Sequence, residues 1–263
     1  METTAGLGIR RFKEGHMFDD VATVAVEYPM TIYVNEEELV TIVCTPEYTE
    51  DLVVGFLTSE GIVRGMADID RIEMIEATGH VKVTANFVNK FNAKYRAKRY
   101  ITSCCGKSRE NFYFQSDASL VESRNETDLQ LQPAEIFDLM QRFEADSDIF
   151  RQTGGVHNAA LCSRDEVICV RMDIGRHNAL DKIYGHCLKN DISMSDKAII
   201  FSGRISSEIL VKTAKIGCGI ILSRSAPTEL AIEMARELNI TAVGFIRGDG
   251  FSVYSGHERI LEN

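Results

Sequence analysis

The sequence predicts an α/β protein made of a smaller α+β N-terminal domain and an α/β C-terminal domain. Three observations indicate this class. The 263 residues suffice for one large domain or two ordinary ones, and 44% of them are hydrophobic, enough for a sizeable core. Short β-branched runs dominate the first half of the chain. In the second half helix and strand patterns alternate, as in a sheet of parallel strands covered by helices.

Composition excludes several classes of protein. The net charge of -10 argues against a general nucleic-acid binder, which needs a basic face to displace phosphate counterions. No apolar run approaches the roughly 20 residues that span a bilayer, and no signal peptide is recognisable, so we expect a cytoplasmic protein without membrane or nucleic-acid partners. Seven cysteines without a CxxC pair fit a reducing compartment better than a disulfide framework.

The N-terminal domain is expected to span residues 1–99. Strands are predicted at Thr23 to Val26, Thr31 to Val34 and Leu39 to Val43, as a small antiparallel sheet. An amphipathic helix follows, opening at Thr49 and closing at Gly61. Two further strands, Arg71 to Glu76 and His80 to Phe87, flank a predicted hairpin turn at Thr78-Gly79.

Residues 100–132 are expected to form a mobile loop, and residues 133–263 a second domain. The second domain begins with a helix at Pro133. Its strands are predicted at Ala159 to Cys162, Val167 to Arg171, Ala198 to Phe201, Gly219 to Leu222, Ala242 to Ile246 and Phe251 to Tyr254. Its further helices are predicted at Arg176 to Leu188, Ser206 to Ile216 and Pro227 to Leu238.

A ligand-binding or catalytic site in such a sheet is expected beyond the carboxyl ends of the parallel strands, where helix N-termini offer free N–H groups. Four turns qualify, and each holds one arginine of the set Arg176, Arg204, Arg224 and Arg247. On an acidic chain, this concentration of positive charge favours a polyanionic ligand such as a nucleotide or pyrophosphate. The alternative is that these arginines are solvated or paired with nearby carboxylates, namely Asp173, Glu208, Glu229 and Asp249.

Histidines are a second candidate feature of this edge. Asp173, His177 and Asp181 could orient one another as a general base with its partner, or His177 could be a structural histidine. His157 follows Gly154-Gly155. Gly106-Lys107-Ser108 lacks the upstream glycine of a P-loop, and the dinucleotide-binding motif GxGxxG is absent. The zinc-binding signature of deaminases is also missing, so a zinc enzyme is not expected.

The adjacent thiols Cys104 and Cys105 are the most distinctive feature. The thiolate is the reactive form of cysteine, and nearby Arg99, Lys107 and Arg109 would favour it electrostatically. A mobile basic loop suits the presentation of a nucleophile to another protein, whereas the alternative is two incidental thiols. The other cysteines, in apolar contexts, are expected to be inert: Cys44, Cys162, Cys169, Cys187 and Cys218.

Six segments together resemble the formate dehydrogenase accessory sulfurtransferase family, FdhD, over essentially the whole chain. They are TSCCGK (Thr102 to Lys107), TGGVH (Thr153 to His157), DIGRHNALDK (Asp173 to Lys182), SGRISSE (Ser202 to Glu208), SRSAPT (Ser223 to Thr228) and GFIRG (Gly244 to Gly248). The resemblance implies a cytidine-deaminase-like C-terminal domain without its zinc site, with a mixed sheet and helices on both faces.

The resemblance also implies a function. It describes a sulfur carrier that takes persulfide sulfur from a cysteine desulfurase and delivers it to the bis-molybdopterin guanine dinucleotide cofactor of formate dehydrogenase. Many members carry a CxxC pair where Cys104 and Cys105 are adjacent here, so the catalytic role is assigned to both. Cys105 is favoured because it directly precedes Gly106-Lys107. A homodimer is left open.

The expected cofactor-binding residues combine the resemblance with the arginine-bearing turns: Arg176, His177, Arg204, Ser223, Arg224, Phe245, Ile246, Arg247, Gly248, Asp249 and Gly250. Two rival functions remain. One is a chaperone that only holds the molybdenum cofactor, and the other is a nucleotide hydrolase that uses His177. Transfer of sulfur to the loop peptide separates the carrier from the chaperone, and release of product from a guanine nucleotide would reveal the hydrolase.

Overall fold

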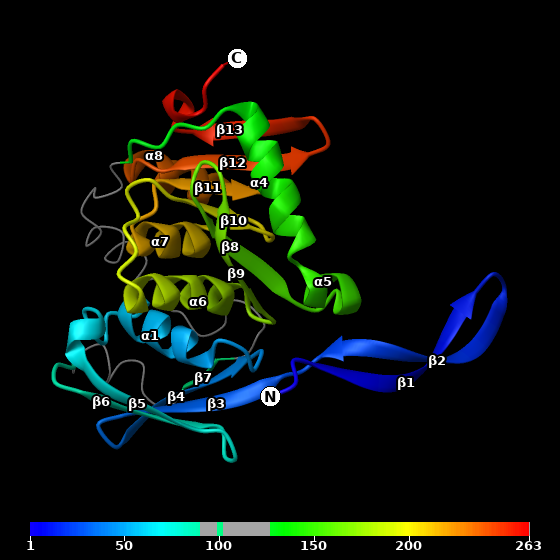
Figure 1. The fold of residues 1–263 in the computed structure, drawn as a ribbon, viewed down its shortest axis with the longest axis vertical. Coiled ribbons are helices and arrows are strands. Elements are labelled where there is room, and N and C mark those ends of the chain that lie inside the picture. Colours follow the sequence, from blue (N-terminus) through cyan, green and yellow to red (C-terminus); the bar gives the residue numbers. More distant parts are fainter. Residues whose placement is uncertain (90–98, 102–126, 263) are drawn as a thin grey trace.

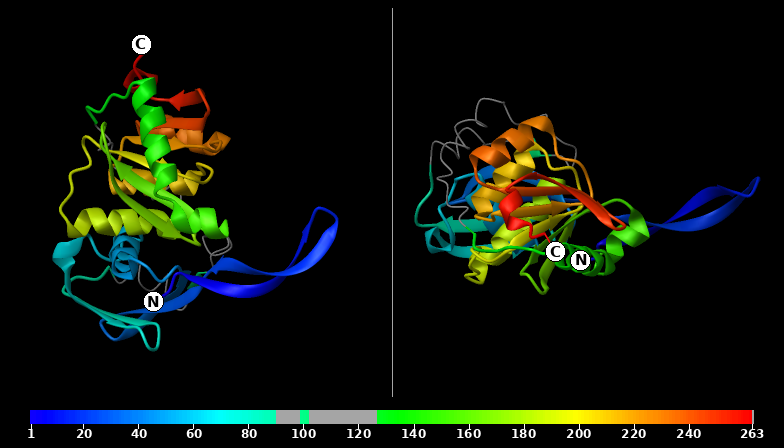
Figure 2. Two further views of the ribbon diagram at one scale, coloured as in Figure 1. Left: turned by 45° about the vertical axis from the view of Figure 1, so that its right-hand side comes forward. Right: turned by 90° about the horizontal axis from the view of Figure 1, so that it is seen from above.

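The computed structural model describes residues 1–89, 99–101 and 127–262 of the chain. These residues form a two-stranded ribbon, a five-stranded sheet and a six-stranded sheet. Figure 1 shows the two larger sheets as separate layers with helices between them, and the ribbon extends away from these layers in Figures 1 and 2. Among the described residues, no helix combines the length and the apolar composition needed to cross a membrane.

The five-stranded sheet belongs to the first half of the chain. Its strands are β3 (Tyr28–Val34), β4 (Glu37–Cys44), β5 (Ile69–Ile75), β6 (His80–Ala85) and β7 (Arg99–Ile101), in the order β5-β6-β3-β4-β7. The pairs β3/β6 and β4/β7 are parallel, and the others are antiparallel. Alternate residues such as Met30, Ile32 and Ile42 are fully buried against helix α1 (Thr49–Ser59), because successive side chains of a strand point to opposite faces. The short turn η1 (Met66–Asp68) precedes β5.

The six-stranded sheet belongs to the second half. Its strands are β8 (His157–Cys162), β9 (Val167–Asp173), β10 (Ala198–Phe201), β11 (Ile220–Ser223), β12 (Thr241–Arg247) and β13 (Gly250–Ser255). They lie in the order β13-β12-β11-β10-β8-β9, with β10, β11 and β12 parallel and the remaining pairs antiparallel.

Helices cover both faces of this sheet. Helices α6 (Arg176–Lys189), α7 (Ser207–Ile216) and α8 (Glu229–Glu237) pack on the face that carries Ile199 and Ile221. Helix α4 (Pro133–Ala145) packs on the opposite face, against Ile200 and Leu222. The short helix α5 (Asp148–Thr153) precedes β8, and η2 (His257–Arg259) follows β13.

Helices α1 and α6 cross in direct backbone contact and join the two halves. A methyl group at Gly55 would overlap the carbonyl oxygen of Asp181, and one at Gly185 would overlap the carbonyl oxygen of Asp51. Only glycine therefore fits at the two crossing points, and the close approach brings neighbouring polar side chains of both helices into the buried layer.

Three buried carboxylates stabilise the same seam. Asp51 of α1 is held by Arg171 and Lys189, each at 3.0 Å. Asp181 of α6 accepts from Lys212 at 2.5 Å and from Ser59 at 2.8 Å, and the third carboxylate, Asp173, joins Lys182 at 2.7 Å. Each carboxylate is paired, as buried charges must be, and each network includes groups from both halves of the chain.

The prediction of an α/β protein is confirmed, including the alternating helices and strands after residue 197. The predicted antiparallel pairing of Thr31 to Val34 with Leu39 to Val43 is confirmed by β3 and β4, whereas the third strand predicted for that sheet, Thr23 to Val26, is not part of it. The sheet instead adds the parallel pairs β3/β6 and β4/β7. Of the ribbon formed by β1 (Thr4–Lys13) and β2 (His16–Ala25), only the end of β2 from Thr23 onward was predicted to be a strand. The domain limits at residues 99 and 132 remain predictions, and Cys104 and Cys105 lie outside the described residues.

Candidate functional site

The ends of five strands meet at one edge of the six-stranded sheet. The parallel strands β10, β11 and β12 end there, and the antiparallel pairing of β8 with β10 places the start of β8 beside them. His157 of β8 pairs with Asp173, the last residue of β9, just before α6 begins at Arg176. This edge, with its loops 202–206, 224–228 and 248–249, is called the arginine rim below, and all four predicted turns contribute to it.

Hydrogen bonds join the loops of the arginine rim. The Ser223 hydroxyl is buried and donates to the Gly203 carbonyl at 2.8 Å, while it accepts from the Ser225 amide at 3.0 Å. The Phe245 amide donates to the Ser225 carbonyl at 3.3 Å. Ser223 therefore positions the loops. Ile246, also predicted to bind cofactor, has its side chain buried in the core that faces α4.

Two of the four rim arginines form ion pairs with carboxylates, and the other two do not. Arg176 lies 3.6 Å from Glu208 and Arg224 lies 2.9 Å from Glu144, so the expected pairing with carboxylates holds for these two, although Glu144 was not among the partners considered. Arg204 and Arg247 are exposed and have no carboxylate within ion-pair distance among the described residues. Arg247 instead donates from Nε to the Arg224 carbonyl at 3.1 Å.

Phe245 is held in an unusual conformation beside Arg247. Its φ of 54° lies in the left-handed region, within a register shift between β12 and β13, and its side chain is 45% exposed. The Arg247 guanidinium lies 5.8 Å from the ring centroid. A non-glycine residue in this region costs about 1–3 kcal/mol, and such strain concentrates at ligand sites. Nothing in the local sequence signalled this conformation.

Gly244 makes the turn at Phe245 sterically feasible. A methyl group there would lie 2.9 Å from the Ser225 carbonyl oxygen and 3.1 Å from the Pro227 ring. The β12 backbone can thus approach the loop after β11 closely, which aligns the Phe245 and Arg247 end of β12 with Arg224. Gly248, Asp249 and Gly250 follow as an exposed turn, with φ of 57° at Gly248.

His157 faces the rim as a neutral imidazole. Its ring stacks on Phe201 with centroids 6.5 Å apart. Burial lowers the pKa of His157, and the nearby positive charge of Arg176 lowers it further, against a smaller opposing effect of Asp173. At neutral pH the ring therefore offers one hydrogen-bond donor and one acceptor without adding charge. Sequence reasoning noted His157 after its two glycines but assigned it no role.

The predicted grouping of Asp173, His177 and Asp181 is wrong. His177 Nε2 lies 2.8 Å from Glu208. Asp173 is fully buried and accepts from the Thr45 and Gly175 amides and from Lys182, while Asp181 points toward Lys212. Two buried lysines thus hold these carboxylates in the seam, and residues four apart on a helix still diverge enough to face different neighbours.

The described thiols are poor nucleophiles. Burial raises the pKa of Cys44, Cys187 and Cys218 to about 12, and burial likewise raises the pKa of Cys162 and Cys169. These shifts favour the protonated thiol at neutral pH, in agreement with the expectation that the five are unreactive. Among the described residues, no three histidine, cysteine or acidic side chains gather as metal ligands.

Strand β7 fixes where the chain departs toward Cys104 and Cys105. Ile101, its last residue, pairs with Ile42 of the parallel strand β4. Strand β4 runs on to Thr45, whose amide donates to Asp173 at 3.0 Å beside the start of α6. Cys104 and Cys105 follow β7 in the sequence and lie outside the described residues.

Comparisons with known proteins agree on one family. A profile of the FdhD/NarQ family matches residues 25–261. "Sulfur carrier protein FdhD" of Listeria monocytogenes (serotype 4b, strain F2365) is 73% identical over 260 residues, covering 99% of this chain and 100% of that protein. The protein of the same name from Bacillus subtilis (strain 168) is 48% identical over 261 residues, covering 99% of each.

A solved structure shares the fold. The crystal structure described as a formate dehydrogenase accessory protein from Desulfotalea psychrophila matches with a TM-score of 0.80, over 99% of this chain and 100% of that one. Its sequence is 24% identical, so this likeness concerns the fold alone.

Proposed function

The chain belongs to the FdhD/NarQ family, and on this premise we propose that it is a sulfur carrier in the maturation of formate dehydrogenase. In detail, it acts as a sulfurtransferase. A cysteine desulfurase supplies persulfide sulfur, Cys104 or Cys105 carries it, and the bis-molybdopterin guanine dinucleotide cofactor receives it before insertion into the enzyme.

The single observation that carries the thiol assignment is the state of the other five cysteines. Four of them are buried and Cys169 is partly buried, and burial raises the pKa of all five, which disfavours a thiolate at neutral pH. The other two cysteines, Cys104 and Cys105, are therefore the candidates for the sulfur-carrying thiol. Arg99, Lys107 and Arg109 lie near them in the sequence. Positive charge of this kind stabilises a thiolate.

The loading step is a transfer of sulfane sulfur. The thiolate of Cys104 or Cys105 attacks the outer sulfur of the desulfurase persulfide, an S–S bond forms here, and the desulfurase cysteine leaves as a thiolate. One S–S bond breaks as another forms, so no external oxidant or reductant is needed. Delivery to the cofactor then requires the carrier to hold that cofactor near the thiols.

The arginine rim supports binding of the cofactor as a substrate. A dinucleotide carries pyrophosphate groups, and the exposed guanidinium groups of Arg204 and Arg247 form charge-assisted hydrogen bonds to phosphate oxygens. The exposed ring of Phe245 beside Arg247 provides a face on which a purine or pterin ring stacks. His157 contributes a neutral hydrogen-bonding group at the same edge.

Residues 133–263 are proposed to be a cytidine-deaminase-like domain. In support, a mixed six-stranded sheet has a helix layer on each face. Metal chemistry of the deaminase kind is not part of the proposal, since the sequence lacks its zinc signature.

To test the proposal, formate dehydrogenase is produced together with variants of this protein in cells that lack any other member of the family, and the activity of the dehydrogenase is measured. Cys104→Ala with Cys105→Ala is expected to leave formate dehydrogenase as inactive as in cells without the carrier. Cys169→Ala, a partly buried thiol in β9, is the matched control and should support full activity. Full activity with the double variant would instead favour the cofactor-holding chaperone, for which the rim alone suffices.

A further inference from the structure

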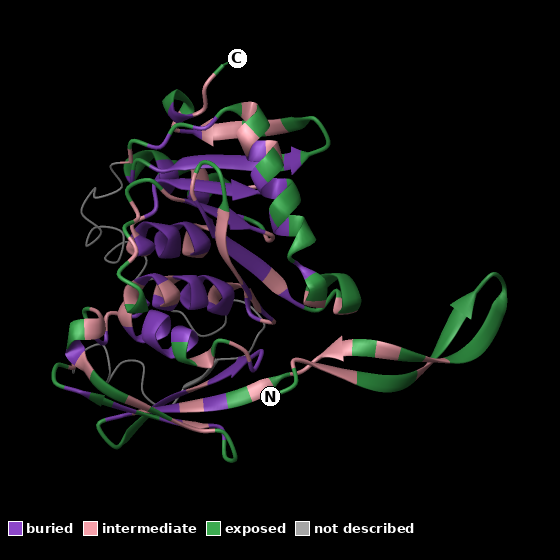
Figure 3. Cartoon of the chain, viewed as in Figure 1, coloured by how far each residue is buried: buried purple, intermediate pink, exposed green. Residues whose placement is uncertain are grey.

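A histidine of α6 lies where the two halves of the chain meet. His186 follows Gly185, the residue at which α6 approaches the backbone of Asp51 in α1. Figure 3 shows α1 and α6 as mostly buried along this seam. The His186 side chain is 24% exposed and reaches the ion pair that Arg171 of β9 forms with Asp51. A titratable ring thus lies at the margin of the layer that joins the halves.

The guanidinium of Arg171 binds groups from three elements at once. Its Nε and Nη2 donate to the Asp51 carboxylate of α1 at 3.1 and 3.0 Å, and its Nη1 donates to the Val170 carbonyl of β9 at 3.0 Å. Nη2 also lies 2.8 Å from Nδ1 of His186 on α6. The ring of Tyr48, just before α1, lies against the guanidinium with its centroid 3.8 Å away. Arg171 is therefore a bridge between α1 and α6.

This bridge requires a neutral His186. A guanidinium only donates hydrogen bonds, so Nδ1 of His186 must accept from Arg171 and carries no proton. The Asn190 amide also approaches Nδ1, at 3.2 Å, while its Nδ2 donates to the His186 carbonyl at 2.8 Å. Burial lowers the pKa of His186 and the charge of Arg171 lowers it further, against an opposing effect of Asp51. The neutral ring therefore carries its proton on Nε2.

The charged groups around His186 leave little room for another cation. Among the described residues, they are Asp51 of α1, 3.9 Å from Nδ1, Arg171 of β9, and Lys189 of α6 itself. Lys189 binds the same Asp51 at 3.0 Å and the half-exposed Glu50 of α1 at 3.1 Å. An imidazolium would thus be the third cation beside one buried carboxylate. A buried charge without its own partner is costly.

We propose that His186 makes the joint between the two halves sensitive to acid. A proton on Nδ1 occupies the lone pair that receives the Arg171 hydrogen bond, so that bond is lost and two cations stand in contact. The nearest carboxylate oxygen for the imidazolium is Oδ2 of Asp51, which already accepts from Arg171. The bridge from α1 to α6 then opens at this end. At the other end of the crossing, the hydrogen bond from Ser59 to Asp181 holds the helices together.

Proton linkage gives the direction of the effect. In the opened joint His186 meets water and its pKa returns toward the ordinary 6.5, whereas in the closed joint its pKa lies lower. Between these two values the opened form binds a proton that the closed form does not, so opening becomes more favourable as pH falls below 6.5. Above 6.5 both forms are neutral and the joint stays closed. Acid thereby changes how the first half is held against the half that carries the arginine rim.

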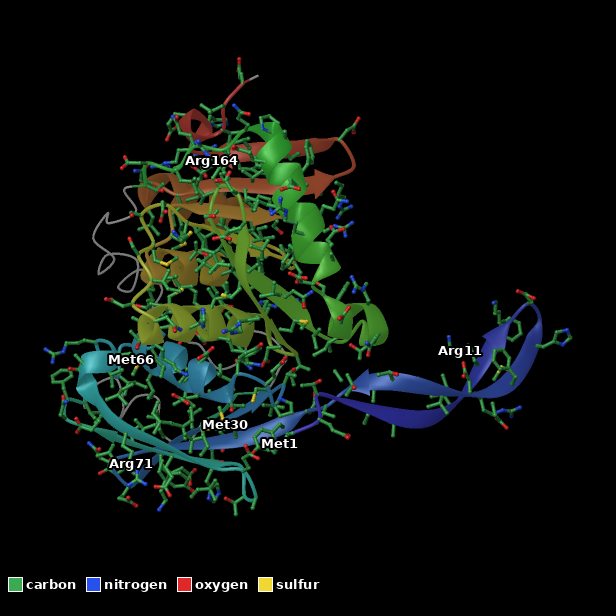
Figure 4. All side chains as sticks on the ribbon, in the orientation of Figure 1. Met1, Arg11, Met30, Met66, Arg71 and Arg164 are labelled. Atoms are coloured by element: carbon green, nitrogen blue, oxygen red, sulfur yellow. The ribbon has the colours of Figure 1, made fainter. Side chains whose placement is uncertain are left out.

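Hydrogen exchange of the full chain tests the proposal, with rates converted to protection factors so that the intrinsic pH dependence of exchange is removed. Between about pH 8 and about pH 5.5, α1 and the second half of α6 should lose about three- to tenfold more protection than α8, which lies outside the seam. His186→Gln keeps an acceptor for Arg171 at every pH and should abolish this extra loss. His16→Gln is the matched control, at the ribbon tip near which Figure 4 labels Arg11, and should behave as wild type.

The nitrogen chemical shifts of the His186 ring in the wild type provide a second measurement. At about pH 8 they should report a neutral ring with its proton on Nε2. A proton on Nδ1 would overturn the proposal. It would also be overturned if α1 and α6 lost no more protection than α8, or if His186→Gln lost as much as the wild type. Neither measurement involves sulfur or the cofactor, so failure here leaves the proposed function untouched.

Discussion

Arg204 and Arg247 differ from the other rim arginines because neither has a carboxylate within ion-pair distance among residues 1–89, 99–101 and 127–262. An arginine already paired gains less from a phosphate, since its carboxylate partner must first be displaced. We therefore expect phosphate recognition to depend chiefly on these two residues, with Arg176 and Arg224 shaping the edge through Glu208 and Glu144.

Arg204→Glu should weaken the binding of a guanine nucleotide by about 1.5–3 kcal/mol, because it replaces a charge-assisted hydrogen bond to phosphate with repulsion. Titration calorimetry measures the affinity, which should also fall as salt is raised. Arg236→Glu makes the same charge change at the last turn of α8, the end away from the rim, and is the control. Equal affinity of wild type and Arg204→Glu for the nucleotide would show that its phosphates do not bind at the arginine rim.

His157 should make stability depend on pH. Its pKa in the folded protein lies below the ordinary 6.5, so between these two values the unfolded chain binds a proton that the folded chain does not. Stability is thus expected to fall as pH drops through 6.5, and His157→Gln should reduce that loss. Urea unfolding at about pH 8 and about pH 5.5 measures both proteins.

His186, whose pKa burial also lowers, contributes equally to wild type and His157→Gln and cancels in the comparison. His16→Gln changes an exposed residue at the ribbon tip and is the control for the substitution itself. If wild type and His157→Gln lost equal stability on acidification, the imidazole would not be held neutral by its surroundings.

The crossing of α1 and α6 is the element on which the relation between the two halves depends. Gly185→Ala should destabilise the protein by at least about 2 kcal/mol, because the added methyl group overlaps the Asp51 carbonyl and forces the helices apart. Thermal and urea unfolding measure the change. Gly65→Ala adds a methyl group where nothing lies within 4 Å and should be nearly neutral. A neutral Gly185→Ala would mean that the helices do not touch as described.

Local patterns predicted most single elements but few of their pairings. Ala198 to Phe201 was predicted with its observed bounds, because a short apolar run between two turn signals reads clearly as a buried strand. The parallel return of β6 beside β3 joins residues some 50 positions apart, which no local pattern encodes. The ribbon was missed because its apolar residues face no core, and the bulge at Phe245 because a left-handed phenylalanine follows from packing around Gly244 rather than from propensity.

The arginine rim itself was predictable from the sequence. Its four turns follow predicted strands, and parallel strands bring such turns to one edge. The partners of the charged residues were not predictable, since Glu208 and Glu144 approach the rim on helices whose orientation only tertiary packing fixes. The same packing buried Asp173 and Asp181 against lysines and left His177 with Glu208.

On the scale of the whole molecule, the two halves of the chain carry the two features on which the proposed function rests. The first half holds the strand that leads to Cys104 and Cys105, and the second half holds the arginine rim. The hydrogen bond from the Thr45 amide to the Asp173 carboxylate links the residue after β4 to the segment just before α6.

Persulfide formation on the intact protein tests the central claim most directly. The full chain is incubated with a cysteine desulfurase and cysteine, and its peptides are then analysed by mass spectrometry under non-reducing conditions. One added sulfur atom is predicted on the peptide that contains Cys104 and Cys105, and none on the peptides of the five other cysteines. Cys104→Ala with Cys105→Ala should acquire no sulfur at all. Sulfur on any of the five other cysteines, or no added sulfur on the wild-type protein, would contradict the account.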